Sequence, residues 1–129
     1  MRKLIIIAAV IMLTGCSTVK GWIPSFADPN QSHSIINVRL AVEQLDCSQP
    51  HLPQVRTIRE HVIWFELYSE SAGWRHADVL RVIEPIRASV DDFYKRSVDQ
   101  QGSVGYCEIK KKLLRTQART AAQAVLGRF

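Results

Sequence analysis

Apolar residues recur every three or four positions through most of the chain beyond residue 34, which is the spacing of one face of an α-helix. The first set lies within residues 35–47, and Ser32 or Ser34 stands where an amino-terminal helix cap is expected. We expect this helix to end near Cys47, before Pro50. The set consists of Ile35, Val38, Val42 and Leu45.

A second apolar set repeats this spacing between residues 55 and 65. Pro53 suits the first turn of a helix and Gly73 suits its end. The stretch Val62–Phe65 is also rich in side chains that favour strands, but the flanking residues keep the helical period, so we predict a helix. The set consists of Val55, Ile58, Val62 and Phe65.

Two further sets predict a third helix over about His76–Val98 and a fourth over about Val104–Leu126. Pro85 lies inside the third segment. Because proline removes a helix hydrogen bond and clashes with the preceding turn, we expect a kink or short break near Glu84. The sets are Val79, Ile83, Ile86, Val90 and Phe93, then Cys107, Leu114, Ala118, Ala121 and Val125.

Four amphipathic helices with short connections predict an all-α fold, a small up-down-up-down helical bundle over residues 35–129. The preceding residues, 17–34, contain Gly21, Pro24 and Pro29 and show no clear helical period. We therefore expect residues 16–34 to form a flexible tether that leads into the bundle.

The first fifteen residues have a different pattern. Arg2 and Lys3 precede an uninterrupted apolar run from Leu4 to Leu13, which is the layout of a secretory signal. As a helix this run would extend about 15 Å, half the thickness of a bilayer's hydrocarbon core. We therefore expect residues 1–15 to be a cleaved signal peptide and not a permanent membrane span.

The tetrapeptide Leu13-Thr14-Gly15-Cys16 resembles the lipobox of bacterial lipoproteins. The resemblance implies that Cys16 receives diacylglycerol, becomes the first mature residue, and is held in the lipid bilayer by two or three acyl chains such as palmitate. Two chains are enough for stable anchoring. Ser17 is not the aspartate that retains lipoproteins in the inner membrane, so outer-membrane placement facing the periplasm is favoured. The alternative is an ordinary buried thiol at Cys16.

Once Cys16 carries lipid, the three cysteines leave one pair, Cys47 and Cys107. Disulfides persist in the periplasm, and in the predicted topology both residues lie at the same pole of the bundle. We predict a disulfide between them, the alternative being two separate buried thiols. There is no CxxC motif, so a redox-active pair is not indicated.

The net charge of the chain argues against nucleic acid as a partner. Loss of Arg2 and Lys3 with the signal lowers the formal net charge from +5 to +3. A mildly basic, exported protein of this kind gives no support for nucleic-acid binding. The 114 residues that remain of 129 suit a single compact domain.

The sequence specifies no catalytic or metal site. It contains no HExxH, glycine-rich phosphate loop or GxSxG, and its four histidines share no helical ligand spacing. Asp91 and Asp92 are adjacent on a helix, so their side chains point in different directions and cannot share a proton. We expect a non-enzymatic protein without metal or cofactor.

Two groups of side chains are candidates for partner binding. Lys111, Arg115 and Arg119 recur every fourth residue and form a basic stripe next to Lys110 and Lys112. The stripe suits anionic headgroups, peptidoglycan carboxylates or an acidic protein, and it also fits an ordinary solvated face balanced by neighbouring acids.

Trp64 and Tyr68 are four residues apart, share a helix face, and lie in sequence near Trp74. They suit an aromatic contact patch, with packing between helices as the alternative.

Three segments are similar to small lipoproteins of tailed phages, a group without an assigned activity. They are Cys47–Pro50, Trp64–Ser71 and Val125–Phe129. The resemblance implies a role in lysis, as an outer-membrane spanin-like protein, or in superinfection exclusion by blocking a receptor. Known outer-membrane spanin subunits are short and proline-rich, whereas this chain is predicted to fold.

The combination of anchor, tether and helical domain predicts a non-enzymatic envelope interaction module that binds another envelope protein. The phage lysis and exclusion roles are alternatives, and a peptidoglycan-acting enzyme is another.

The anchor is testable by fractionation. We expect Cys16→Ser to move the protein from the membrane fraction to the soluble fraction, because no acyl chain remains to hold it. Immunoblotting of both fractions measures the shift. Continued sedimentation with membranes would show that something other than Cys16 attaches the protein.

Overall fold

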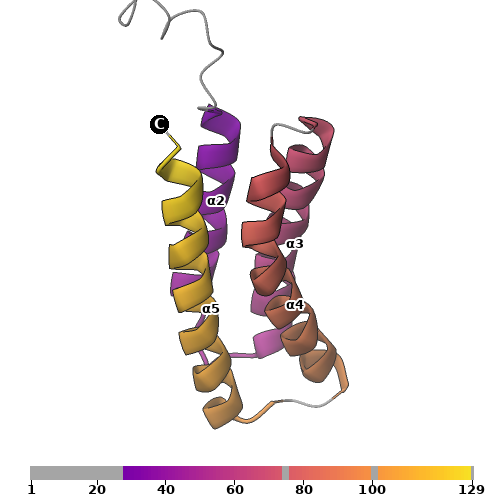
Figure 1. The fold of residues 1–129 in the computed structure, drawn as a ribbon. Helices are drawn as coiled ribbons and strands as arrows, with labels where there is room; N and C mark the ends of the chain where they lie inside the picture. Colours follow the sequence, from indigo (N-terminus) through magenta and orange to yellow (C-terminus); the bar gives the residue numbers. More distant parts are fainter. Residues whose placement is uncertain (1–27, 74–75, 100–101, 129) are drawn as a thin grey trace, which may run out of the picture.

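The computed structural model describes residues 28–73, 76–99 and 102–128, which form four α-helices. They are α2 (Pro29–Glu43), α3 (His51–Ser71), α4 (Ala77–Asp99) and α5 (Val104–Leu126). Both α2 and α4 pack against α3 and α5, and successive helices alternate in direction around one core (Figure 1). The predicted all-α up-down-up-down bundle is confirmed. The predicted signal peptide, Cys16 and the part of the predicted tether up to residue 27 lie outside the described residues.

One core joins the four apolar stripes. Every residue of the four predicted apolar sets is buried, with at most 2% of its surface exposed. Phe65 of α3 and Phe93 of α4 are the largest fully buried side chains. On α5 the stripe ends in the small side chains Ala118, Ala121, Ala122 and Val125. None of the described helices has an apolar stretch long enough to cross a membrane.

The amino end of the bundle corrects the expected boundary at residue 35. Helix α2 begins at Pro29, so residues 29–34 belong to the helix and not to a tether. Asp28 caps it by accepting hydrogen bonds from the backbone N–H groups of Asn30 (2.9 Å) and Gln31 (3.3 Å). Pro29 at the first helical position has the backbone angle that a helix start requires. Ser32 and Ser34 lie inside the helix.

The middle helices follow the sequence prediction with one difference. Val62–Phe65 is helical, and α3 ends before Gly73, which adopts φ of 84° and thereby turns the chain in a conformation that glycine adopts freely. Of the kink or short break expected near Glu84, the break is absent, because helix α4 runs without interruption through Pro85. Pro85 is on the exposed side of the bundle, where water can satisfy the carbonyl group that proline leaves without a donor.

The predicted disulfide joins Cys47 and Cys107, with their Cα atoms 5.6 Å apart. Cys47 lies in the connection from α2 to α3, and Cys107 lies near the start of α5. Both are buried, at 3% and 0% exposure. The bond therefore closes the pole of the bundle opposite the start of α2 (Figure 1).

Reduction of this disulfide is expected to destabilise the fold. The two cysteines are 60 residues apart, and release of a loop of that length is worth about 4 kcal/mol of unfolding free energy in the chain-entropy model. Urea titrations with and without reductant measure the loss, and intact mass should rise by two hydrogen atoms on reduction. A Cys16→Ser chain serves as control and should keep the same difference. An unchanged mass would contradict the bond.

Candidate partner-binding surfaces

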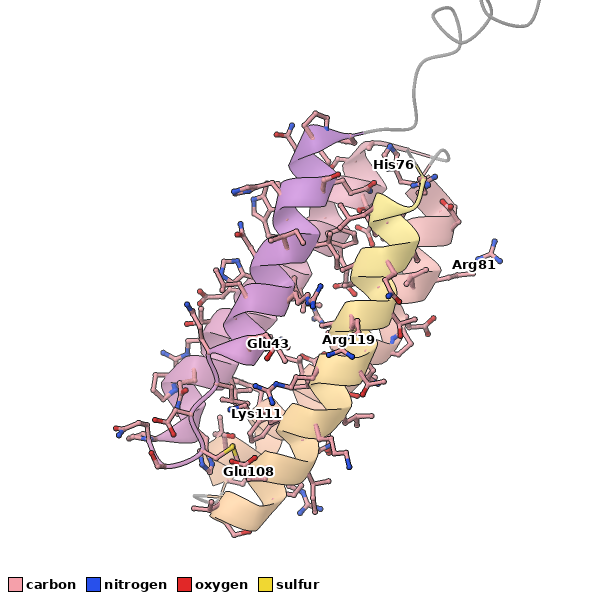
Figure 2. All side chains as sticks on the ribbon, turned by 90° about the vertical axis from the view of Figure 1, so that its left-hand side faces the viewer. Glu43, His76, Arg81, Glu108, Lys111 and Arg119 are labelled. Carbon is pink, nitrogen blue, oxygen red and sulfur yellow. A yellow bond between two sulfur atoms is a disulfide. The ribbon has the colours of Figure 1, made fainter. Side chains whose placement is uncertain are left out.

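The basic stripe lies along the seam between α5 and α2. Arg115 and Arg119 directly follow the buried Leu114 and Ala118, so the stripe flanks the core stripe of α5. In Figure 2, Lys111 and Arg119 of α5 lie on the same side as Glu43 of α2. The structure thus brings the three predicted residues, Lys111, Arg115 and Arg119, to one face.

Acidic neighbours neutralise only part of this stripe. Arg115 Nε contacts Glu43 Oε2 at 2.8 Å, and both side chains are well exposed. The pKa of Asp46 is below its usual value, chiefly because the Ser48 hydroxyl and backbone N–H donate to it, with a smaller attraction from Lys111. Among the described residues, Lys111, Lys112 and Arg119 form no ion pair.

Lys110 belongs to the other side of α5. Its ammonium group and the Tyr106 hydroxyl both donate to Asp92 of α4, which lowers the pKa of that carboxyl. Arg96 lies over the Tyr106 ring, 4.8 Å from its centre. Of three consecutive lysines, therefore, one is engaged in the α4–α5 seam, and Lys111 and Lys112 remain on or beside the stripe.

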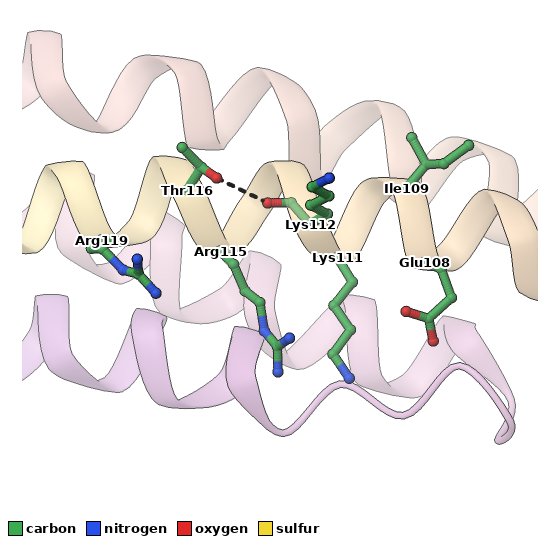
Figure 3. A pocket seen from close by; sticks show the side chains of 7 residues that line it. All are labelled: Glu108, Ile109, Lys111, Lys112, Arg115, Thr116 and Arg119. Carbon is green, nitrogen blue, oxygen red and sulfur yellow. Dashed lines mark hydrogen bonds between the residues drawn. The ribbon is translucent and has the colours of Figure 1, made fainter.

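A groove of about 520 Å³ follows the outer surface of α5. Glu108 and the basic stripe form one side of it (Figure 3). Ile109, Lys112 and Thr116 form the other side. The groove is open to solvent and rich in guanidinium and ammonium donors, so it is suited to binding carboxylates or other anions.

Exposed apolar side chains border this basic face. Ile36 and Leu40 of α2 are 40% and 51% exposed, and their spacing places them on the same side of α2 as Glu43, which pairs with Arg115. Ile109, within the groove, is 69% exposed. The α2–α5 face therefore combines positive charge with uncovered aliphatic surface.

The aromatic candidates lie on α3. Trp64 and Tyr68 stack with ring centres 5.1 Å apart, and Trp64 is 51% exposed beside the exposed Leu67. Tyr68 also has an internal role, since its hydroxyl donates to Asp28 Oδ2 at 2.7 Å. Asn30 donates to the Tyr68 oxygen and lowers its pKa, but the Asp28 carboxylate and burial outweigh this and the pKa is raised. Trp74 lies outside the described residues.

A buried polar cluster near the start of α2 was not predicted. Gln31, only 1% exposed, donates from Nε2 to the Ser69 hydroxyl at 3.0 Å, and His76 Nδ1 lies 2.7 Å from the same nitrogen. His76 marks this pole in Figure 2. Gln31 is 38 and 45 residues away from its two partners, so no local pattern reveals the cluster. It fixes the start of α2 against α3 and the start of α4.

Asp91, Asp92 and Glu66 take part in contacts between helices. Asp91 accepts from Arg59 Nε (2.7 Å) and Arg87 Nε (2.8 Å), and although burial raises its pKa, these hydrogen bonds outweigh burial and lower it. Asp92 faces α5, so the two adjacent carboxylates serve different helix seams. Glu66 pairs with Arg87 at 2.9 Å.

A second hollow, of about 780 Å³, lies at the disulfide pole and is lined by residues 47–53 and 97–99 with Gly102 and Val104. No group of three or more His, Cys, Asp or Glu side chains in the described ranges is placed to hold a metal ion.

No protein-family model, curated protein or solved structure matches the chain.

The hydrogen bond from the Tyr68 hydroxyl to Asp28 is expected to contribute to the stability of the fold. We expect Tyr68→Phe to lower the free energy of unfolding by about 1 kcal/mol, because the Asp28 cap loses one hydrogen bond. Trp64→Ala removes a half-exposed ring and should change it less. Urea titration measures both. A larger loss for Trp64→Ala would show that the exposed ring, and not the cap, stabilises this pole.

Proposed function

We propose that the protein is a lipid-anchored, non-enzymatic module that binds another protein of the bacterial envelope. The lipobox sequence at residues 13–16 supports the anchor. The residue after Cys16 is Ser17 and not the aspartate that retains lipoproteins in the inner membrane, which supports attachment to the outer membrane with the bundle facing the periplasm. The bundle, about 35 Å long from the 23 residues of α5, supplies a rigid body beyond the lipid surface.

One observation carries the proposal: positive charge is concentrated on α5. This helix contains five basic residues and one acid, a formal charge of +4 against +3 for the whole mature chain. The rest of the chain is therefore close to neutral. All basic residues of α5 except Lys110 line the exposed groove. Charge segregated in this way on a folded surface steers and orients an oppositely charged partner.

The surroundings of this charge favour a protein partner. Exposed Ile36, Leu40 and Ile109 border the basic face, and protein interfaces combine apolar contact area with a polar rim. The disulfide and the buried core hold α5 in place, so little conformational order has to be gained on binding.

Crosslinking in whole cells tests the proposal. We expect the tagged, lipidated chain, crosslinked before lysis, to recover one envelope protein repeatedly, and Cys16→Ser to reduce that recovery because the chain leaves the membrane surface. Mass spectrometry identifies and quantifies the recovered protein against an untagged strain.

Two outcomes would contradict the proposal. One is recovery of no protein above the untagged control. The other is digestion of isolated cell wall by the purified full-length chain, since that result would replace a binding module by a peptidoglycan-acting enzyme.

A further inference from the structure

The groove on α5 has the geometry of a helix-binding surface. Side chains four residues apart form ridges along a helix, and the space between two ridges accepts a ridge of another helix. One side of the groove is the ridge Lys111, Arg115 and Arg119, and the other is the ridge formed by Lys112 and Thr116 (Figure 3). A helix whose own ridge has the same spacing fits this groove with its axis crossing α5 at about 50°.

The charges of the groove specify what such a ridge must carry. Lys111 and Arg119 are eight residues apart, about 12 Å along the helix, and neither forms an ion pair with a described residue. Glu43 already holds a carboxylate 2.8 Å from Arg115, between them. Acidic side chains at positions i, i+4 and i+8 of a partner helix would match these three cations.

A flat anionic membrane surface fits this face less well. Glu43 and Glu108 lie within the basic face (Figure 2), and both would be repelled by a plane of anionic headgroups. A planar surface would also rest on the ridges and leave the groove empty. A helix fills the groove and can carry cationic or neutral side chains opposite the two acids.

We propose that the groove between Lys111–Arg115–Arg119 and Lys112–Thr116 binds an acidic amphipathic α-helix of the envelope partner. The inference rests on the proposed function and names its surface and the chemistry of its occupant. Carboxylates of the partner contact the three cations, and its apolar side chains cover Ile109 in the groove and Leu40 on the adjacent helix α2, which are 69% and 51% exposed.

The test uses the full-length lipidated chain in non-ionic detergent micelles and a synthetic helical peptide with three glutamates four residues apart beside a row of leucines. Fluorescence anisotropy measures binding. We expect the double variant Lys111→Glu/Arg119→Glu to weaken binding about tenfold, the effect of roughly 1.4 kcal/mol lost over two exposed charge pairs. A peptide with glutamine in place of glutamate should bind as weakly to the unaltered chain.

A matched control variant is Arg56→Glu/Arg81→Glu. It changes the net charge equally, but Arg56 lies on α3 and Arg81 on α4, where Arg81 points away from the α2–α5 seam (Figure 2). We expect it to retain peptide binding. Equal weakening by the two double variants would overturn the proposal, because only net charge would then matter.

A variant that binds the peptide more tightly cannot owe its effect to misfolding, and Glu43→Gln is expected to be such a variant. Glu43→Gln releases Arg115 from its ion pair and removes a carboxylate that repels the peptide, so we expect tighter binding by several-fold. Unchanged or weaker binding would mean that the peptide does not contact Arg115, and the proposed groove would be wrong.

A photo-crosslinking residue at Thr116 locates the occupant in cells. We expect it to crosslink to an acidic helical segment of the protein recovered in the envelope experiment. The same photo-crosslinking residue at the exposed Ala88 of α4 should give no crosslink.

Crosslinks from Thr116 to phosphatidylglycerol in vesicles, absent in vesicles of phosphatidylcholine alone, would show that the groove binds a membrane surface and not a helix. Recovery of the partner unaffected by Lys111→Glu/Arg119→Glu would overturn the groove and leave the interaction module standing.

Discussion

The apolar side chains of the four helices meet in one core, and their burial determines which face each helix turns outward. On α5 the buried residues Leu114 and Ala118 are each followed by an arginine. One residue further along a helix is a rotation of about 100°, so the basic stripe must emerge beside the core, at the seam with α2. The position of the charge is therefore a consequence of packing.

The seams between neighbouring helices differ in how many of their charged side chains form ion pairs. Between α3 and α4, Asp91 receives two guanidinium groups and Arg87 also reaches Glu66. Between α4 and α5, Lys110 and Tyr106 share Asp92. Between α2 and α5 only Arg115 has a carboxylate partner among the described residues. Exposed ion pairs contribute little stability each, so the contrast has little effect on the stability of the fold and supports the proposed recognition role of the α2–α5 seam.

Much of this fold could be predicted because the helices bury apolar residues at helical spacing. The disulfide followed from counting cysteines and from the topology. Residues 29–34 of α2 were not predicted as helix because the buried positions among them, Gln31 and Ser34, are polar. The hydrogen-bond partners of Gln31 are 38 and 45 positions away. The Asp28-Pro29 pair was the local signal for that helix start. The stripe itself was visible as a four-residue repeat, whereas its pairing with Glu43 depends on how α2 and α5 are aligned.

The disulfide also defines how mechanical load passes through the protein. The chain enters the bundle at Asp28, runs through α2 to Cys47, and crosses there to Cys107 at the start of α5. A continuous covalent path thus connects the amino-terminal end of the bundle to the helix that carries the basic groove, and it bypasses α3 and α4. With the anchor and partner proposed above, tension between membrane and partner would be borne by α2, the disulfide and α5. The covalent connection would remain even if α3 and α4 unfolded.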